Sequence, residues 1–273
     1  MARKFICVWA PWFRTEIETH THPEWVHLPL AIYSLESRQR DLLEVSPCAA
    51  HAGLTVGMSL REAQLRCPKA ILVADDRPRY GKAFLPVIDA LDCFSPQVEE
   101  TDLGMAFADA TGLTLLYGSD LELCRKIQIA IRESTVHRVN VGLAGSKFAA
   151  EIVARTADPS GIGAVLETDA MHLAQLPLTM LPLSKKTIKQ LNLLGVCDLG
   201  AFAALPANTV RSKYGVEGHI AQKMASGLDD RPIKPRLRPL GFEETTEFEW
   251  GEQNLDRVAF AIQSMATRLA HRL

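Results

Sequence analysis

The sequence predicts an α+β fold that is built from several small parts. Up to about residue 165, strand-like runs with alternating or continuous apolar residues are interspersed with amphipathic helices. From Ala170 to Gly227 the pattern changes to short helices that are separated by Pro and Gly. A length of 273 residues is enough for two or three modest domains, each with its own core.

The strands follow from local patterning and from turn residues. Within residues 3–9, Phe5, Cys7 and Trp9 alternate with the apolar Ile6 and Val8, as in a strand that is buried on both faces. Gly104 stands at a tight reversal between two strand-like runs and predicts a hairpin. The remaining predicted strands and the two arms of the hairpin cover residues 28–33, 70–73, 97–102, 105–109 and 138–144.

The helices are predicted from apolar spacing and capping residues. Ser59 caps one helix, and Glu62 stands three residues further on, as in a capping box. Ser184 caps another helix, which runs through Leu194 and stops at Gly195. With a following helix over 198–205 it looks like a helix-hairpin-helix pair. The predicted helices cover residues 59–66, 78–94, 121–132, 146–157, 184–194 and 198–205.

The last part of the chain differs again. Residues 231–239 hold three prolines and four basic residues, which predicts an extended linker rather than a core element. A strand-like run over 242–248 and an amphipathic helix from Asn254 to the end follow. One strand and one helix cannot form a domain core, so we expect the natural protein to continue beyond this chain.

The composition restricts the class of protein. The net charge is −2 and the sequence pI is about 6.5, which argues against a strong non-specific nucleic-acid binder but allows local basic patches. Six scattered cysteines form no Cys-x-x-Cys motif, which favours a reducing compartment and gives no zinc site. No apolar run approaches the roughly 20 residues of a membrane span. We therefore expect a cytoplasmic protein without cofactor or membrane partner.

Five segments together carry a resemblance to a known family: 46–60 (SPCAAHAGLTVGMSL), 94–109 (FSPQVEETDLGMAFAD), 142–147 (GLAGSK), 194–199 (LGVCDL) and 230–232 (DRP). They are similar to motifs in the fingers, palm and thumb of Y-family (translesion) DNA polymerases. The resemblance covers nearly the whole chain. It implies a palm of mixed sheet and helices over 1–25 and 75–165, small fingers over 26–74, a helical thumb over 166–232, a linker over 233–240 and the N-terminal part of a little finger over 241–273.

At the positions where the family has its metal-binding and nucleotide-contacting residues, this sequence has different residue types. In that family, carboxylates on the first strand and in the palm hairpin hold the two magnesium ions of nucleotidyl transfer. Magnesium requires hard oxygen ligands, which Trp, Gly and Met side chains lack. We therefore predict no catalytic residue, no bound metal and no enzyme activity, although Asp102 remains near the hairpin turn. The departing positions are Trp9, Pro11, Gly104 and Met105 at the metal site, Arg14 at the steric gate, and Pro47 and Ala50 in the fingers.

This combination is similar to the ImuB group of catalytically silent Y-family relatives. The resemblance implies a non-catalytic scaffold in DNA-damage tolerance, that is, in SOS translesion synthesis and induced mutagenesis. The implied partners are primer-template DNA, an ImuA-type protein, a C-family error-prone polymerase and the sliding clamp. Two alternatives stay open: a divergent active translesion polymerase that uses Asp102, and an interaction module that never meets DNA.

The DNA-binding candidates lie mainly in the helix-hairpin-helix and in the basic linker. Such a hairpin offers backbone N–H groups and basic side chains to phosphates without reading sequence. A solvated helix face and a charged tether explain the same residues equally well. The candidates are Lys147, Lys185, Lys186, Lys189, Gly195, Arg236 and Arg238.

Overall fold

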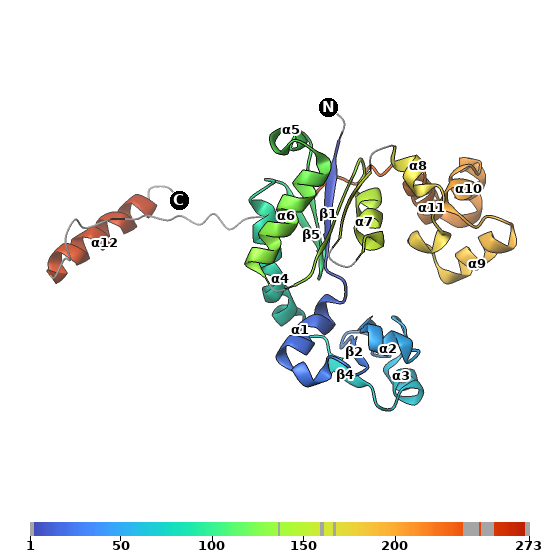
Figure 1. The fold of residues 1–273 in the computed structure, drawn as a ribbon, viewed down its shortest axis with the longest axis horizontal. Coiled ribbons are helices and arrows are strands. Elements are labelled where there is room, and N and C mark those ends of the chain that lie inside the picture. The colour runs from blue at the N-terminus through green and yellow to red at the C-terminus, as the bar shows by residue number, and fades with distance from the viewer. Residues whose placement is uncertain are drawn as a thin grey trace. The chain divides into compact units, whose positions relative to one another are not determined.

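The computed structural model describes residues 3–135, 137–158, 161–165, 168–236, 246 and 254–270. The chain divides into two units, Met1–Arg236 and Leu237–Leu273, which are described separately below. Figure 1 shows the ribbon of both units. Among the helices of the described ranges, none is long and apolar enough to cross a membrane.

The first unit is built on a five-stranded sheet with the strand order β5-β6-β1-β7-β8. The central strand β1 pairs antiparallel with both β6 and β7, and β8 runs parallel to β7. The predicted hairpin is confirmed, because β5 and β6 pair antiparallel up to the turn. The strands are β1 (Phe5–Trp9), β5 (Val98–Asp102), β6 (Met105–Asp109), β7 (Asn140–Ala144) and β8 (Ile162–Ala164).

The two faces of this sheet are covered by different helices. Ile6 and Val8 of β1 belong to a core with α4 (Arg77–Asp92) and α6 (Asp120–Ser134). Phe5 and Cys7 point the other way, into a core that includes α7 (Lys147–Thr156). Figure 1 shows α4 and α6 on one side of the sheet and α7 on the other. The prediction of a first strand that is buried on both faces is therefore confirmed.

A second, three-stranded sheet has the order β3-β2-β4 and its own small core. The predicted cap of α3 is confirmed, since the Ser59 side chain accepts a hydrogen bond from the backbone N–H of Glu62. The helix α1, which the sequence patterning had not predicted, leads from the large sheet to this small one. The elements are α1 (Phe13–Thr21), a 3-10 turn (Pro23–Trp25), β2 (Leu30–Tyr33), β3 (Leu42–Val45), α2 (Pro47–His51), α3 (Leu60–Arg66) and β4 (Ile71–Ala74).

Helices follow the last strand and share one core with the α7 face of the large sheet. The predicted end of α9 is confirmed: Gly195 has a φ of +80°, and the backbone N–H of Val196 reaches back to the Leu191 carbonyl, as in a Schellman motif. Gly215, with a φ of +70°, kinks α11. The helical elements are α8 (Asp169–Leu173), a 3-10 turn (Leu178–Met180), α9 (Lys185–Leu193), α10 (Leu199–Ala203) and α11 (Ala207–Ala225), with the short α5 (Thr114–Tyr117) earlier in the chain.

The described part of the predicted linker is extended and runs along the edge strand β5. The backbone N–H of Arg236 donates to the Val98 carbonyl at 2.9 Å, and that of Lys234 donates to the Glu99 carboxylate at 2.6 Å. These bonds cover part of an otherwise open sheet edge. In the second unit, α12 (Leu255–Ala270) confirms the predicted amphipathic helix. The predicted strand over 242–248 lies outside the described residues, apart from position 246.

Candidate functional site

A cavity of about 330 Å³ lies between the β5–β6 hairpin and the small sheet. Trp9 and Met105, two of the departing positions, face each other across the β1–β6 register and both line this cavity. Met105 is 9% exposed, and the guanidinium carbon of Arg155 lies 5.4 Å from the Trp9 ring centroid. The two apolar side chains thus occupy one wall of the site, and a cavity remains beside them.

Gly104 occupies the hairpin turn in a conformation that only glycine adopts readily. Its φ is +84°, and a Cβ at this position would lie 3.0 Å from both the Ala10 carbonyl oxygen and the Phe13 Cβ. The Gly104 carbonyl also accepts a hydrogen bond from the Ala10 N–H at 2.8 Å. In this backbone, a carboxylate side chain at position 104 would collide with the start of α1.

Arg14 lines the hairpin cavity and forms ion pairs with three carboxylates. Its guanidinium is within 3.2 Å of Asp75 and 3.6 Å of both Glu44 and Asp102. Burial raises the pKa of Glu44, while the N–H of Thr15 and the charge of Arg14 act in the opposite direction. The ion pairs connect α1 with β3, with the segment after β4 and with the hairpin, so Arg14 fastens the small sheet to the large one.

The residues at the departing positions do not fit the two-magnesium site of the family. Trp9, Gly104 and Met105 offer no side-chain oxygen, and Glu44, Asp75 and Asp102 already surround a guanidinium. Within the described ranges, no group of three His, Cys, Asp or Glu side chains is arranged to hold a metal ion.

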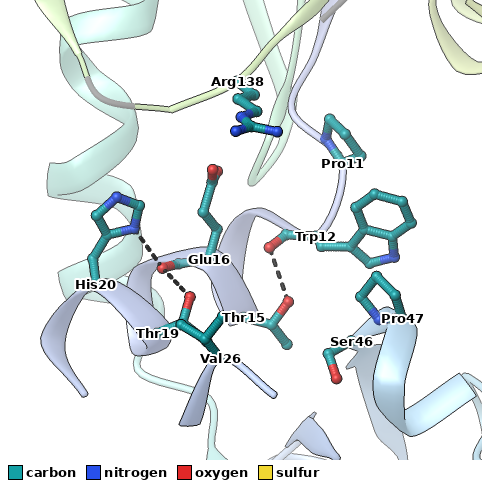
Figure 2. A pocket seen from close by; sticks show the side chains of 10 residues that line it. All are labelled: Pro11, Trp12, Thr15, Glu16, Thr19, His20, Val26, Ser46, Pro47 and Arg138. Atoms are coloured by element: carbon teal, nitrogen blue, oxygen red, sulfur yellow. Dashed lines mark hydrogen bonds between the residues drawn. The ribbon is translucent and has the colours of Figure 1, made fainter. Parts of the chain in front are cut away.

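The other departing positions lie apart from the hairpin cavity. Pro11 and Pro47 line a second cavity of about 490 Å³, which Figure 2 shows from close by. Ala50 is exposed on α2. Pro11 and Pro47 thus line a different cavity from Trp9, Arg14 and Met105, and Trp12 lines both.

The DNA-binding candidates differ sharply in how available they are. Lys185, Lys186 and Lys189 are exposed on α9, and the described residues provide none of them with an ion-pair partner. Gly195 is also exposed, at the turn that follows. These residues are accessible to a ligand, and their role in DNA binding stays a prediction.

Two of the remaining candidates are engaged within the protein. The ammonium group of Lys147 is buried, 2.8 Å from the Glu99 carboxylate. The guanidinium of Arg236 is paired with Asp89 and Asp92. Arg238 lies outside the described residues. Sequence reasoning missed these pairings and the Arg14 cluster, because their partners are distant along the chain and no local pattern marks them.

The family comparison covers more than half of the chain. The family model described as the impB/mucB/samB family matches residues 8–155. The chain belongs to this family. The predicted relationship to Y-family DNA polymerases and the predicted α+β fold are confirmed by the comparisons with known sequences and structures.

Curated members of this family are similar over most of the chain. A DNA polymerase IV of Dehalococcoides mccartyi (strain CBDB1) is 30% identical over 244 residues, which are 89% of this chain and 63% of the relative. A DNA polymerase IV of Ralstonia nicotianae is 27% identical over 248 residues, covering 89% of this chain and 69% of the relative. This chain thus spans 63% of the length of the first of these relatives.

Solved structures share the fold. The crystal structure of DinB from Sulfolobus solfataricus aligns with a TM-score of 0.74 at 23% identity, over 85% of this chain and 69% of that chain. An insertion ternary complex of Dbh DNA polymerase aligns with a TM-score of 0.70 at 24% identity, over the same shares. At these identities the likeness shows the fold alone.

These relatives correct one prediction. From the side chains at positions 9, 104 and 105 we expected a pseudo-polymerase, that is, a protein that is not an enzyme. That prediction is wrong, because the comparisons find curated relatives that are named DNA polymerase IV. The alternative of an active translesion polymerase agrees better with these findings.

Proposed function

We propose that this chain is the palm, fingers and thumb part of a translesion DNA polymerase that acts on primer-template DNA. One observation carries the proposal: the large sheet with its hairpin, the small sheet and the helix-hairpin-helix occur in one chain, in a fold shared with the DinB crystal structure. The names of the sequence relatives support the activity. We assign the protein to the cytoplasm as part of the same proposal.

The thumb supplies the DNA contacts in this proposal. The three lysines of α9 are exposed, and Ser184 caps the start of the helix, where backbone N–H groups favour anions. Neutralising a phosphate releases counterions, so each contact adds to the salt dependence of binding. Lys147 and Arg236 are engaged in internal ion pairs and contribute to DNA binding only if those pairs open.

Primer extension tests the proposal. A labelled primer annealed to a longer template is incubated with the purified protein, all four deoxynucleotides, and magnesium or manganese. We expect extension that depends on the template and follows the protein peak in size-exclusion chromatography. Extension that is missing with both metals, in a preparation that still binds the primer-template, would overturn the polymerase activity.

The recruiting role that the ImuB resemblance implies is a second part of the proposal. It concerns an ImuA-type protein, a C-family error-prone polymerase and the sliding clamp. Purified candidates of these three kinds are passed over the immobilised chain, and retention above that of a blank column supports the role. Failure of all three to bind at micromolar concentration would overturn it, whatever the outcome of primer extension.

A further inference from the structure

The second cavity, shown in Figure 2, has features that the polymerase proposal does not use. It measures about 490 Å³ and lies between α1, the start of α2 and the segment that leads into β7. In the described part of the chain it shares only Trp12 with the hairpin cavity. Its size is in the range of pockets that enclose small organic ligands, about 300–1,000 Å³.

Two side chains of opposite charge, Glu16 and Arg138, line this cavity and are not paired with each other. Figure 2 shows the side chains of Glu16 and Arg138 pointing toward each other, and no ion pair or hydrogen bond joins them. The Oε2 atom of Glu16 is buried without a hydrogen-bond partner, 3.4 Å from His137 Nδ1. Arg138 is exposed, and the described residues offer its guanidinium no partner. Buried polar atoms without hydrogen-bond partners are rare in proteins, so the Glu16 Oε2 atom requires an explanation.

His20 adds a third polar group whose tautomer follows from its contact. Its Nδ1 lies 2.8 Å from the backbone carbonyl oxygen of Glu16. A carbonyl oxygen only accepts, so Nδ1 carries the hydrogen and donates it. In the neutral form of the ring Nε2 is then an acceptor, and no hydrogen bond from the described residues reaches it.

Trp12 forms an aromatic wall and has a strained backbone. Its φ is 55°, in the left-handed region, and its side chain lies beside Pro11 and Pro47 (Figure 2). Such a conformation costs a bulky residue on the order of 1–3 kcal/mol and tends to occur at functional sites. The residue is 45% exposed, so part of the indole is available for stacking.

We propose that this cavity binds a nucleobase, with guanine preferred. A simple anion would be repelled by Glu16 and a simple amine by Arg138, so the ligand must present both donors and acceptors. Guanine does so on neighbouring edges: its O6 and N7 accept from an arginine, and its N1–H and N2–H₂ donate to a carboxylate. Stacking of a base on an aromatic ring such as Trp12 is worth about 1–3 kcal/mol.

The base can come from a free nucleotide or from an unstacked position in a single strand, and two titrations distinguish these sources. In the first, dGMP, dAMP, dCMP and dTMP are titrated separately against the whole chain by calorimetry. In the second, an oligothymidine that carries one central guanine is compared with plain oligothymidine. We expect dGMP, the guanine oligonucleotide or both to bind at least tenfold more tightly than their counterparts. Affinities within twofold across both sets would overturn the proposal.

Substitutions assign the binding to this cavity rather than to the hairpin cavity. Arg138→Gln and Glu16→Gln each should weaken guanine binding at least tenfold. Arg132→Gln, which removes the same charge from an exposed position on α6, should leave it unchanged. Thermal unfolding confirms that each variant is folded. Guanine binding that is insensitive to both pocket variants would contradict the assignment. The inference does not rest on nucleotidyl transfer, so guanine binding would stand even if primer extension failed.

Discussion

The two cavities that flank Trp12 differ in how their charges are satisfied. In the hairpin cavity, Arg14 is surrounded by three carboxylates, and Arg155 pairs with Glu151 at 2.8 Å. In the second cavity, Glu16 and Arg138 face each other without forming an ion pair, and the Glu16 carboxylate lies 3.4 Å from His137 Nδ1. The difference indicates that the charges of the first cavity fix the protein's own structure, whereas those of the second remain available to a ligand.

Replacing Arg14 should have the largest effect on stability. Arg14→Met leaves the mostly buried Glu44 without its counter-charge, which typically costs about 3–5 kcal/mol. Arg138→Gln, in the other cavity, removes an exposed charge for which the described residues provide no partner and should change the free energy of unfolding by less than about 0.5 kcal/mol. Urea unfolding measures both. Equal losses in the two variants would remove the distinction between the cavities.

A methyl group at the hairpin turn should have the next largest effect. Gly104→Ala adds the cost of a left-handed conformation, about 1–2 kcal/mol, to contacts of 3.0 Å with Ala10 and Phe13. Gly118→Ala is the matched control, because its φ is +89° but nothing lies within 4 Å of the added Cβ. Chemical denaturation should show a larger loss for Gly104→Ala. Identical losses would mean that the turn relaxes away from α1.

The Asp229 carboxylate is a further charge whose partners lie within the protein, at the start of α7 and in the segment that follows α11. It accepts the Phe148 N–H at 3.0 Å and pairs with Arg231. Burial pushes its pKa upward, but the hydrogen bonds and charge of Arg231 outweigh burial and leave the pKa below its usual value. Asp229→Asn should cost about 1–3 kcal/mol at neutral pH.

The pH dependence of that loss checks its cause. Since the pKa is lowered in the folded chain, the stabilisation is complete above the unfolded value of about 3.9 and is lost as pH falls through the folded pKa. The difference between the parent chain and Asp229→Asn should therefore shrink in acid. The exposed neighbour serves as the control, since Asp230→Asn should show little effect at any pH. A difference that is constant down to pH 2 would contradict the electrostatic origin.

The thumb lysines should give the smallest effect per residue. Lys185→Gln with Lys186→Gln should lower primer-template affinity severalfold and reduce the slope of log K against log salt by about 1–2. The double control Lys69→Gln with Lys82→Gln removes two exposed charges outside the thumb. Fluorescence anisotropy across salt concentrations compares the two pairs. If both pairs change the slope alike, α9 is not the contact surface.

The sequence predicted much of the fold because its signals are local. Ser59, Ser184 and Gly195 mark helix ends through backbone groups within a few residues, and the apolar run over 5–9 identifies a buried strand. The helix α1 was missed because its buried side includes Arg14 and Glu18, which do not read as an apolar stripe.

The candidate site was harder to predict because its contacts are distant in sequence. The sequence shows that Trp9, Gly104 and Met105 each stand where the family has a metal-binding carboxylate. Judging these positions singly led to the wrong prediction that the chain is not an enzyme. It does not reveal that Glu44 and Asp75 converge with Asp102 on one guanidinium. The placement of Glu16 near Arg138 in the second cavity likewise depends on contacts of α1 with the segment that leads into β7.

Primer extension past a damaged template position tests the central claim most directly. The template carries one abasic site, and the labelled primer ends immediately before it. We predict products longer than the primer, which appear in proportion to the protein across a size-exclusion peak and are absent without template. If the chain binds this primer-template but leaves every primer at its starting length with magnesium and with manganese, the claim of a translesion polymerase is contradicted.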